Sequence, residues 1–123
     1  MAKVLGVGGV FFKAHNPEKL GAWYAKWLGI TIDPSYGGCG FDPATMPQNS
    51  YTVWSPFKAD TDYFQPSPNP YMINLIVDDL YEALDQVQEG GATLAGAPEE
   101  IEFGKFGWFI DPEGNKIELW QPA

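Results

Sequence analysis

The sequence has little cysteine, histidine or basic charge, and each shortage excludes a class of protein. A single cysteine, Cys39, cannot form a disulfide within the chain, which is typical of a reducing compartment. Seven basic residues against 16 acidic ones give a net charge of −9. Nucleic acid is therefore not expected as a partner, because phosphate binding needs clustered Lys and Arg. No apolar run approaches the length of a membrane span, so a membrane is not expected as a partner either.

The apolar run from Val4 to Phe12 is the only segment that looks like a targeting signal. No small-residue cleavage site follows it, Lys13 ends it at once, and a helix signal comes next. We therefore predict a buried first strand and a cytoplasmic protein. With 123 residues, 45% of them hydrophobic, the chain is long enough for one globular domain with a real core.

The segment over residues 103–120 carries the strongest local pattern. Its Asp-Pro-Glu-Gly stretch predicts a tight turn, because Pro112 presets φ at the second position and Gly114 accepts a positive φ. Runs rich in aromatic and β-branched residues lie on both sides, which predicts a β-hairpin. In the second arm Glu118 shares a strand face with Trp120. A carboxylate in such surroundings is unusual, because burying an unpaired charge is costly.

A strand followed by a capped helix is predicted in the first half of the chain. The strand covers residues 3–14, and Asn16 and Pro17 are a favoured N-cap and first helical residue. Gly29 is expected to end this helix. Its buried positions repeat at helical spacing, and they are Leu20, Trp23, Tyr24 and Trp27.

The same plan recurs in the second half. A strand over residues 71–77 precedes Asp79, which has capping-box spacing to Glu82. Gly90 and Gly91 end the predicted helix, and the acidic stretch near Glu99 is predicted to be a solvated loop. The buried stripe of this helix is Leu80, Leu84 and Val87.

Short extended runs follow each helix and complete two β-α-β-β-β units, an α+β arrangement. Unit one covers residues 1–64, a proline-rich linker covers 65–70, and unit two covers 71–123, all within one domain. The prolines of the linker disfavour both helix and central strand. The remaining strands are expected over residues 30–32, 40–41 and 51–55 in unit one, and 93–94, 106–110 and 116–120 in unit two.

This tandem plan and the closing hairpin resemble the vicinal oxygen chelate superfamily, which includes glyoxalases, bleomycin-resistance proteins and extradiol dioxygenases. The resemblance implies a curved mixed sheet that encloses a pocket, with the helices outside. It also implies a homodimer, because members generally close their pockets at a two-fold or pseudo-two-fold interface. Besides the hairpin, the matching pieces are Pro17-Glu18-Lys19-Leu20, Trp23-Tyr24, Leu28-Gly29 and Val77-Asp78-Asp79-Leu80.

The resemblance also implies metal ligands on the first and last strands of each unit, and most of them are missing. The position seven residues before each helix cap is Gly9 in unit one and Met72 in unit two, and the last strand of unit two provides Glu118. Residues 51–55 contain no His, Glu or Asp. The single histidine, His15, is predicted to lie at the surface beside the helix cap. One carboxylate does not make a stable divalent-metal site, so we expect neither a metal nor a cofactor.

Strand alternation predicts which side chains face the pocket. The expected wall is aromatic, with Lys13, Asn74 and Glu118 as its polar groups, and Gly9, Ile76 and Ile110 on the same faces. Such a wall suits a flat or cationic ligand, and the alternative is that the aromatic residues fill a collapsed core. The predicted ligand-binding residues are Phe11, Lys13, Trp54, Met72, Asn74, Phe106, Trp108, Glu118 and Trp120.

Three functions are compatible with this wall. The first is a metal-independent protein of the bleomycin-resistance type that binds a small aromatic or cationic organic molecule. The second is a lyase or isomerase in which Glu118 is the catalytic acid or base. The third is a glyoxalase-like enzyme that recruits a divalent metal through Glu118 and donors such as Asn74. In each case a buried carboxylate must be satisfied, so we expect Glu118 to bond Asn74, a tyrosine or water.

Overall fold

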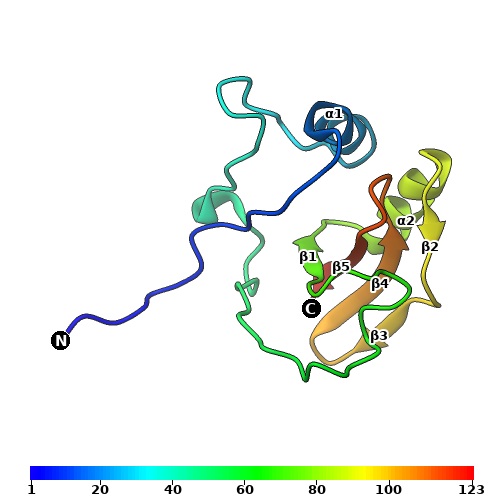
Figure 1. The fold of residues 1–123 in the computed structure, drawn as a ribbon. Helices are drawn as coiled ribbons and strands as arrows, with labels where there is room; N and C mark the ends of the chain where they lie inside the picture. The colour runs from blue at the N-terminus through cyan, green and yellow to red at the C-terminus, as the bar shows by residue number, and fades with distance from the viewer.

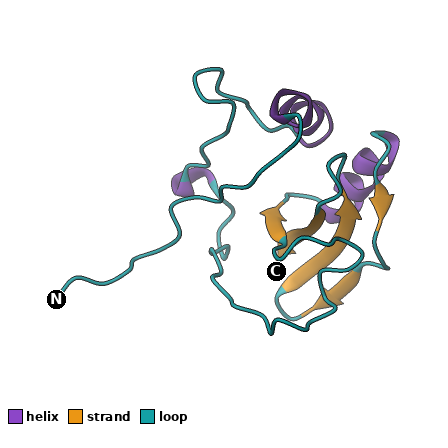
Figure 2. Ribbon diagram, viewed as in Figure 1, coloured by secondary structure: helices purple, strands orange, loops and turns teal.

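Most of the regular structure lies in the second half of the chain. The computed structural model describes residues 1–123 and has the α+β architecture expected from the sequence (Figure 1). Two helices and one open, mixed sheet are joined by long irregular segments (Figure 2). The elements are α1 (Pro17–Leu28), η1 (Pro43–Thr45), β1 (Ile73–Ile76), α2 (Leu80–Glu89), β2 (Thr93–Leu94), β3 (Glu99–Ile101), β4 (Gly104–Ile110) and β5 (Lys116–Pro122).

The sheet is built around the predicted hairpin. Strand order is β1-β5-β4-β2, with β3 also paired to β4, and only the β1–β5 pair is parallel. The hairpin turn forms as predicted, with Gly114 at φ 82° and the Asp111 backbone N–H donating to the Asn115 carbonyl at 2.9 Å. The acidic stretch at Glu99 is exposed, but it forms the edge strand β3 rather than a loop, because its backbone pairs with β4.

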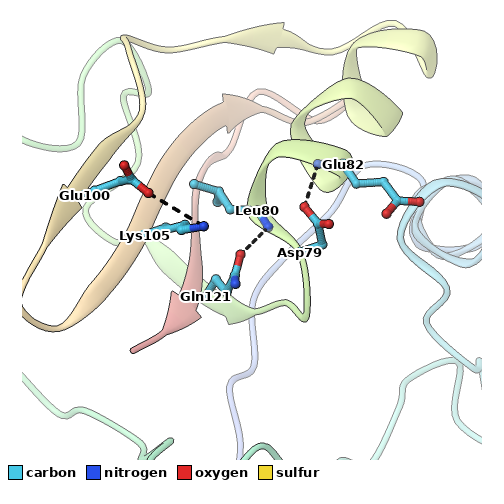
Figure 3. A network of polar contacts seen from close by, with 6 residues as sticks. All are labelled: Asp79, Leu80, Glu82, Glu100, Lys105 and Gln121. Carbon is cyan, nitrogen blue, oxygen red and sulfur yellow. Dashed lines mark hydrogen bonds and ion pairs between the residues drawn. The ribbon is translucent and has the colours of Figure 1, made fainter.

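Helix α2 covers one face of the sheet and forms the core with it. Its side chains Leu80, Ala83, Leu84 and Val87 are buried against Phe109, Ile117 and Leu119. Figure 3 shows how this helix begins: Asp79 accepts from the Glu82 backbone N–H at 3.0 Å, and Gln121 of β5 accepts from that of Leu80 at 2.9 Å. The first bond caps the helix, and the second joins the helix to the strand beneath it.

Helix α1 begins and ends as predicted but lies mainly against α2. Asn16 caps it by accepting from the Lys19 backbone N–H, and Gly29 ends it at φ 68°. Leu20 and Tyr24 are buried, while Trp23 and Trp27 are only half-buried. Two hydrogen bonds join the helices: Trp23 Nε1 donates to the Gly90 carbonyl at 2.9 Å, and Gln86 donates to the Trp27 carbonyl at 2.7 Å.

The strands predicted for the first unit do not form in the structure. Residues 1–14 and 46–57 are extended or irregular, and the N-terminal segment projects away from the sheet (Figure 1). A strand needs a neighbour to accept its backbone hydrogen bonds, and these segments have none. The prediction of a buried first strand is therefore wrong for this structure: Phe11 is 96% exposed. None of the helices is both long enough and apolar enough to span a bilayer.

Candidate functional site

The face of the sheet opposite α2 carries the pocket residues predicted on β1, β4 and β5. In the register, Asn74 of β1 and Trp108 of β4 both lie beside Glu118 of β5. Their strand neighbours Phe109, Ile117 and Leu119 point to the α2 side and are buried in the core. Alternation along the strands is therefore confirmed, and one face combines a carboxylate, an amide and indole rings. The residues on this face are Asn74, Ile76, Phe106, Trp108, Ile110, Lys116, Glu118 and Trp120.

Three side chains donate hydrogen bonds to the Glu118 carboxylate. Asn74 Nδ2 donates to Oε1 at 2.7 Å, while the Tyr63 hydroxyl and Trp108 Nε1 donate to Oε2 at 2.5 and 2.8 Å. The expected bonds to Asn74 and to a tyrosine are confirmed. All three donors are neutral groups, so the carboxylate is stabilised without an ion pair, and Glu118 as a residue is half-buried.

Tyr63 comes from the irregular segment that crosses this face. Its ring meets Trp108 edge-on at 6.3 Å between centroids and stacks on Phe57 at 5.7 Å. Burial raises the pKa of the Tyr63 phenol, and the hydrogen bond to the Glu118 carboxylate raises it further. The hydroxyl therefore keeps its proton and acts as a donor, although 37% of the residue's surface remains exposed.

Lys116 lies on the same strand face and directs its ammonium group at aromatic rings. Its Nζ donates to the Tyr63 carbonyl at 2.6 Å and lies 5.1 Å from the Tyr63 ring centroid and 6.0 Å from that of Trp108. The one ion pair in the structure joins Lys105 to Glu100. Lys116 thus makes cation–π contacts rather than neutralising Glu118.

A second aromatic group surrounds Trp120 farther along the strand. Phe106 stacks on it at 6.1 Å with an interplanar angle of 11°, and Tyr51 meets it edge-on at 5.0 Å. The indole Nε1 donates to the Phe103 carbonyl at 2.8 Å. Trp120 is 5% exposed, so its ring serves as a fixed wall.

The pocket residues predicted from unit one are not at this face. Phe11, Lys13 and Trp54 are exposed, Trp54 at 79%. The strands predicted to carry these residues do not form, so no strand pairing directs their side chains toward the Glu118 face. The pocket wall predicted from unit one is therefore missing in the single chain. Met72 is half-buried and precedes β1 by one residue.

Tyr63, Tyr51 and Lys116 were not among the predicted ligand-binding residues. Lys116 shares parity with Glu118 and Trp120, so alternation alone would have found it. Tyr63 and Tyr51 lie in irregular segments, where no periodicity indicates direction. The only signal for them in the sequence is the number of aromatic residues over 51–64, before the proline-rich linker.

The hairpin turn holds a second polar cluster, centred on buried Asp111. The Tyr24 hydroxyl of α1 donates to Oδ2 at 2.9 Å, and the backbone N–H groups of Glu113 and Asn115 donate to Oδ1 at 2.9 Å each. The Asn115 amide also donates to both carboxylate oxygens. Burial raises the pKa of the Tyr24 phenol, and the neighbouring Asp111 charge adds to this effect. The cluster anchors α1 to the hairpin.

Glu113 makes a further link between the turn and α1. Its carboxylate accepts from the backbone N–H groups of His15 and Asn16 at 2.8 and 3.0 Å. These two bonds favour the charged form, so they lower the pKa of Glu113. His15 is exposed beside the cap, as predicted.

The side chains at the Glu118 face do not fit a divalent metal. No group of three or more His, Cys, Asp or Glu side chains that could hold an ion occurs in the structure. Glu118 is the only carboxylate at this face, and both of its oxygens already accept hydrogen bonds. A stable zinc site needs three or four side-chain donors, which this face does not provide.

Comparison with known proteins gives one family and a set of related folds. A family model described as a glyoxalase-like domain matches residues 9–120. TnmS3, an antibiotic binding protein from Streptomyces sp. CB03234, has a TM-score of 0.60 and 20% identity over 100% of both chains. A member of the glyoxalase/bleomycin resistance protein/dioxygenase superfamily from Sphaerobacter thermophilus DSM 20745 has a TM-score of 0.51 and 24% identity over 98% of each chain. A search of curated proteins found no match. At these identities the likeness is one of fold.

Proposed function

The chain belongs to the glyoxalase-like domain family, and on that premise we propose that it binds a small aromatic or cationic organic molecule without a metal. The observation that carries this proposal is the composition of the Glu118 face. A carboxylate held by neutral donors lies beside Trp108 and on the same sheet face as Trp120, which combines aromatic rings with one oriented acceptor. The antibiotic-binding role stated for TnmS3 supports the same kind of function in a related fold.

Binding is tested by calorimetry with planar aromatic probes on the wild-type chain and on Glu118→Gln. The substitution keeps the size of the side chain but replaces an acceptor oxygen by a donor amide, which opposes the donors Tyr63 and Trp108. We expect probe affinity to fall by about tenfold or more, as for loss of a hydrogen bond to a charged acceptor.

Glu102→Gln is the matched control, because Glu102 is exposed on the chain between β3 and β4 and makes no hydrogen bond to another side chain. Far-UV circular dichroism should show that both variants keep the fold. If no planar aromatic or cationic probe binds the wild-type chain at millimolar concentration, the proposal is refuted. Equal probe affinity in wild type and Glu118→Gln would show that the Glu118 carboxylate takes no part in binding.

An acid–base enzyme is the second candidate, and the contact between Tyr63 and Glu118 is the observation that favours it. The phenol proton lies between two oxygens 2.5 Å apart, so the pair can pass a proton to or from a bound substrate. Such a lyase or isomerase would turn over in the presence of a chelator and lose activity in Glu118→Gln.

The proposal includes a homodimer in which a second copy completes the sheet around the pocket. Support comes from the first half of the chain, where seven aromatic side chains between Phe11 and Phe57 are 43–96% exposed. At 150–250 Å² for each fully exposed ring, they present roughly 900 Å² of apolar surface, close to the ~800 Å² per partner of a standard interface. Strand β1 also has a free edge next to the Glu118 face. Light scattering at micromolar concentration tests the assembly, and a monomer would refute it.

A further inference from the structure

Tyr63 fills the Glu118 site in the way a bound molecule would. Its ring lies edge-on against Trp108, the Lys116 ammonium lies 5.1 Å from its centroid, and its hydroxyl donates to Glu118. These are three separate recognition contacts for one aromatic ring: a wall, a cation and an acceptor. The residue that makes them belongs to no helix or strand.

The contacts around Tyr63 describe the chemistry that the site prefers. Glu118 Oε2 accepts one hydrogen bond from Trp108 and one from Tyr63. A molecule that replaces Tyr63 must therefore supply a hydrogen-bond donor of its own. The Lys116 ammonium favours an electron-rich, uncharged ring and disfavours a second cation in the same place. An aromatic molecule with a hydroxyl group satisfies both conditions, whereas an aromatic ammonium satisfies only the first.

We infer that the site takes neutral hydroxylated aromatic molecules, and that Tyr63 is an internal substitute that such a ligand displaces. This inference rests on the proposed function and narrows it from aromatic or cationic ligands to phenols. The ligand hydroxyl donates to Glu118 in place of the Tyr63 hydroxyl, and its ring packs on Trp108 near Lys116. No bond is made or broken, and the phenol remains protonated throughout.

The segment that carries Tyr63 is held on this face by a small set of contacts, among them the hydrogen bond from Lys116 Nζ to the Tyr63 carbonyl at 2.6 Å and the edge-on packing of Tyr51 on Trp120 at 5.0 Å. Residues 51–60 are exposed, and Tyr63 itself is half-exposed. Its ring stacks on Phe57 from the same segment, so the two rings can leave the face together. A ligand must then replace the hydrogen bond to Glu118, the edge-on contact with Trp108 and the cation–π contact with Lys116, and it must offset any loss of the hydrogen bond from Lys116 to the Tyr63 carbonyl.

The decisive experiment compares three naphthalene probes on the wild-type chain and on Tyr63→Phe. The probes are 2-naphthol, its methyl ether 2-methoxynaphthalene, which cannot donate, and 2-naphthylmethylamine, which is cationic at neutral pH. Tyr63→Phe keeps the ring but removes the competing hydroxyl. Because a ligand that must displace a bound group has its affinity reduced by the open fraction, 2-naphthol should bind Tyr63→Phe about tenfold more tightly. The methyl ether and the amine should bind at least about tenfold more weakly than 2-naphthol.

Calorimetry gives the affinities, and the indole N–H resonance of Trp108 shows whether the probe binds at this site. Tyr81→Phe is the matched control, since Tyr81 is exposed on α2 and its hydroxyl makes no hydrogen bond. If probes bind but show no preference for the hydroxyl and no gain in Tyr63→Phe, the inference is overturned while the proposed function stands. If no probe binds either protein, both are overturned. Circular dichroism and thermal unfolding check that Tyr63→Phe is folded.

Discussion

Removing the hydroxyl of Tyr24 should measure how strongly α1 is held on the hairpin. In Tyr24→Phe the ring stays in place, packed edge-on against Trp23 at 5.0 Å and near Phe109 at 6.5 Å. Only the hydrogen bond to Asp111 Oδ2 is lost, and that oxygen keeps its bond from Asn115 at 2.9 Å. A hydrogen bond to a charged group contributes about 1.5–3 kcal/mol, and the remaining donor places this one near ~1.5–2 kcal/mol.

The expected loss corresponds to a decrease in Tm of roughly 6 °C for a chain of this size. Chemical denaturation should show a lower midpoint with an unchanged slope, because the exposed area on unfolding is the same. Tyr81→Phe serves as the control, since Tyr81 is an exposed residue and its hydroxyl makes no hydrogen bond. A Tyr24→Phe variant within about 0.5 kcal/mol of wild type would refute the idea that this bond anchors α1.

The same substitution should change the response to alkaline pH. Burial raises the pKa of Tyr24 in the folded chain, so the unfolded chain loses this phenolic proton first. Stability is then complete below about pH 10 and falls as the pH rises beyond it. Tyr63, whose pKa is also raised, acts in the same direction. Unfolding midpoints between pH 8 and 11 should therefore fall less steeply for Tyr24→Phe, and equal slopes would show that Tyr24 is not responsible.

Two further substitutions probe the frame of the site. The pKa of Glu113 is lowered by the backbone N–H groups of His15 and Asn16, so its contribution is present above about pH 4.3 and is lost as the pH falls through the lower folded value. Glu113→Gln should reduce the acid dependence of Tm between pH 2 and 5, and an unchanged profile would contradict this. Leu119 is fully buried under α2, so Leu119→Ala should cost about 2–5 kcal/mol in urea denaturation. A loss below about 1 kcal/mol would mean that the core repacks.

The second half of the chain could be predicted from sequence because its signals are local and agree with one another. The cap at Asp79, the stripe on α2 and the turn at Gly114 each depend on neighbouring residues. Once the hairpin pairs, alternation decides which side chains reach the Glu118 face. For the same reason Glu118 could be expected to find donors, since a half-buried carboxylate between indoles requires them.

The first half could not be predicted in the same way, because a strand pattern does not specify the partner strand. The run from Val4 to Phe12 has the composition of a buried strand, yet it is exposed in a single chain that offers it no edge. The placement of Tyr63 was hidden for a related reason. The direction of the Tyr63 side chain depends on where the irregular segment crosses the sheet. No periodic pattern in the sequence predicts that position.

Helix α1 belongs to one unit by sequence but packs against the other. By repeat, α1 belongs to the first unit, but Tyr24 bonds Asp111, Glu113 bonds the start of the helix, and Trp23 bonds Gly90. All of these partners lie in the second unit and on the α2 side of the sheet. Residues 1–13 and 31–72 contribute no side chain to the buried core. The proposed ligand, which displaces Tyr63, and the proposed second copy would both act on these segments. We therefore expect the proposed binding to leave the packing of the core unchanged.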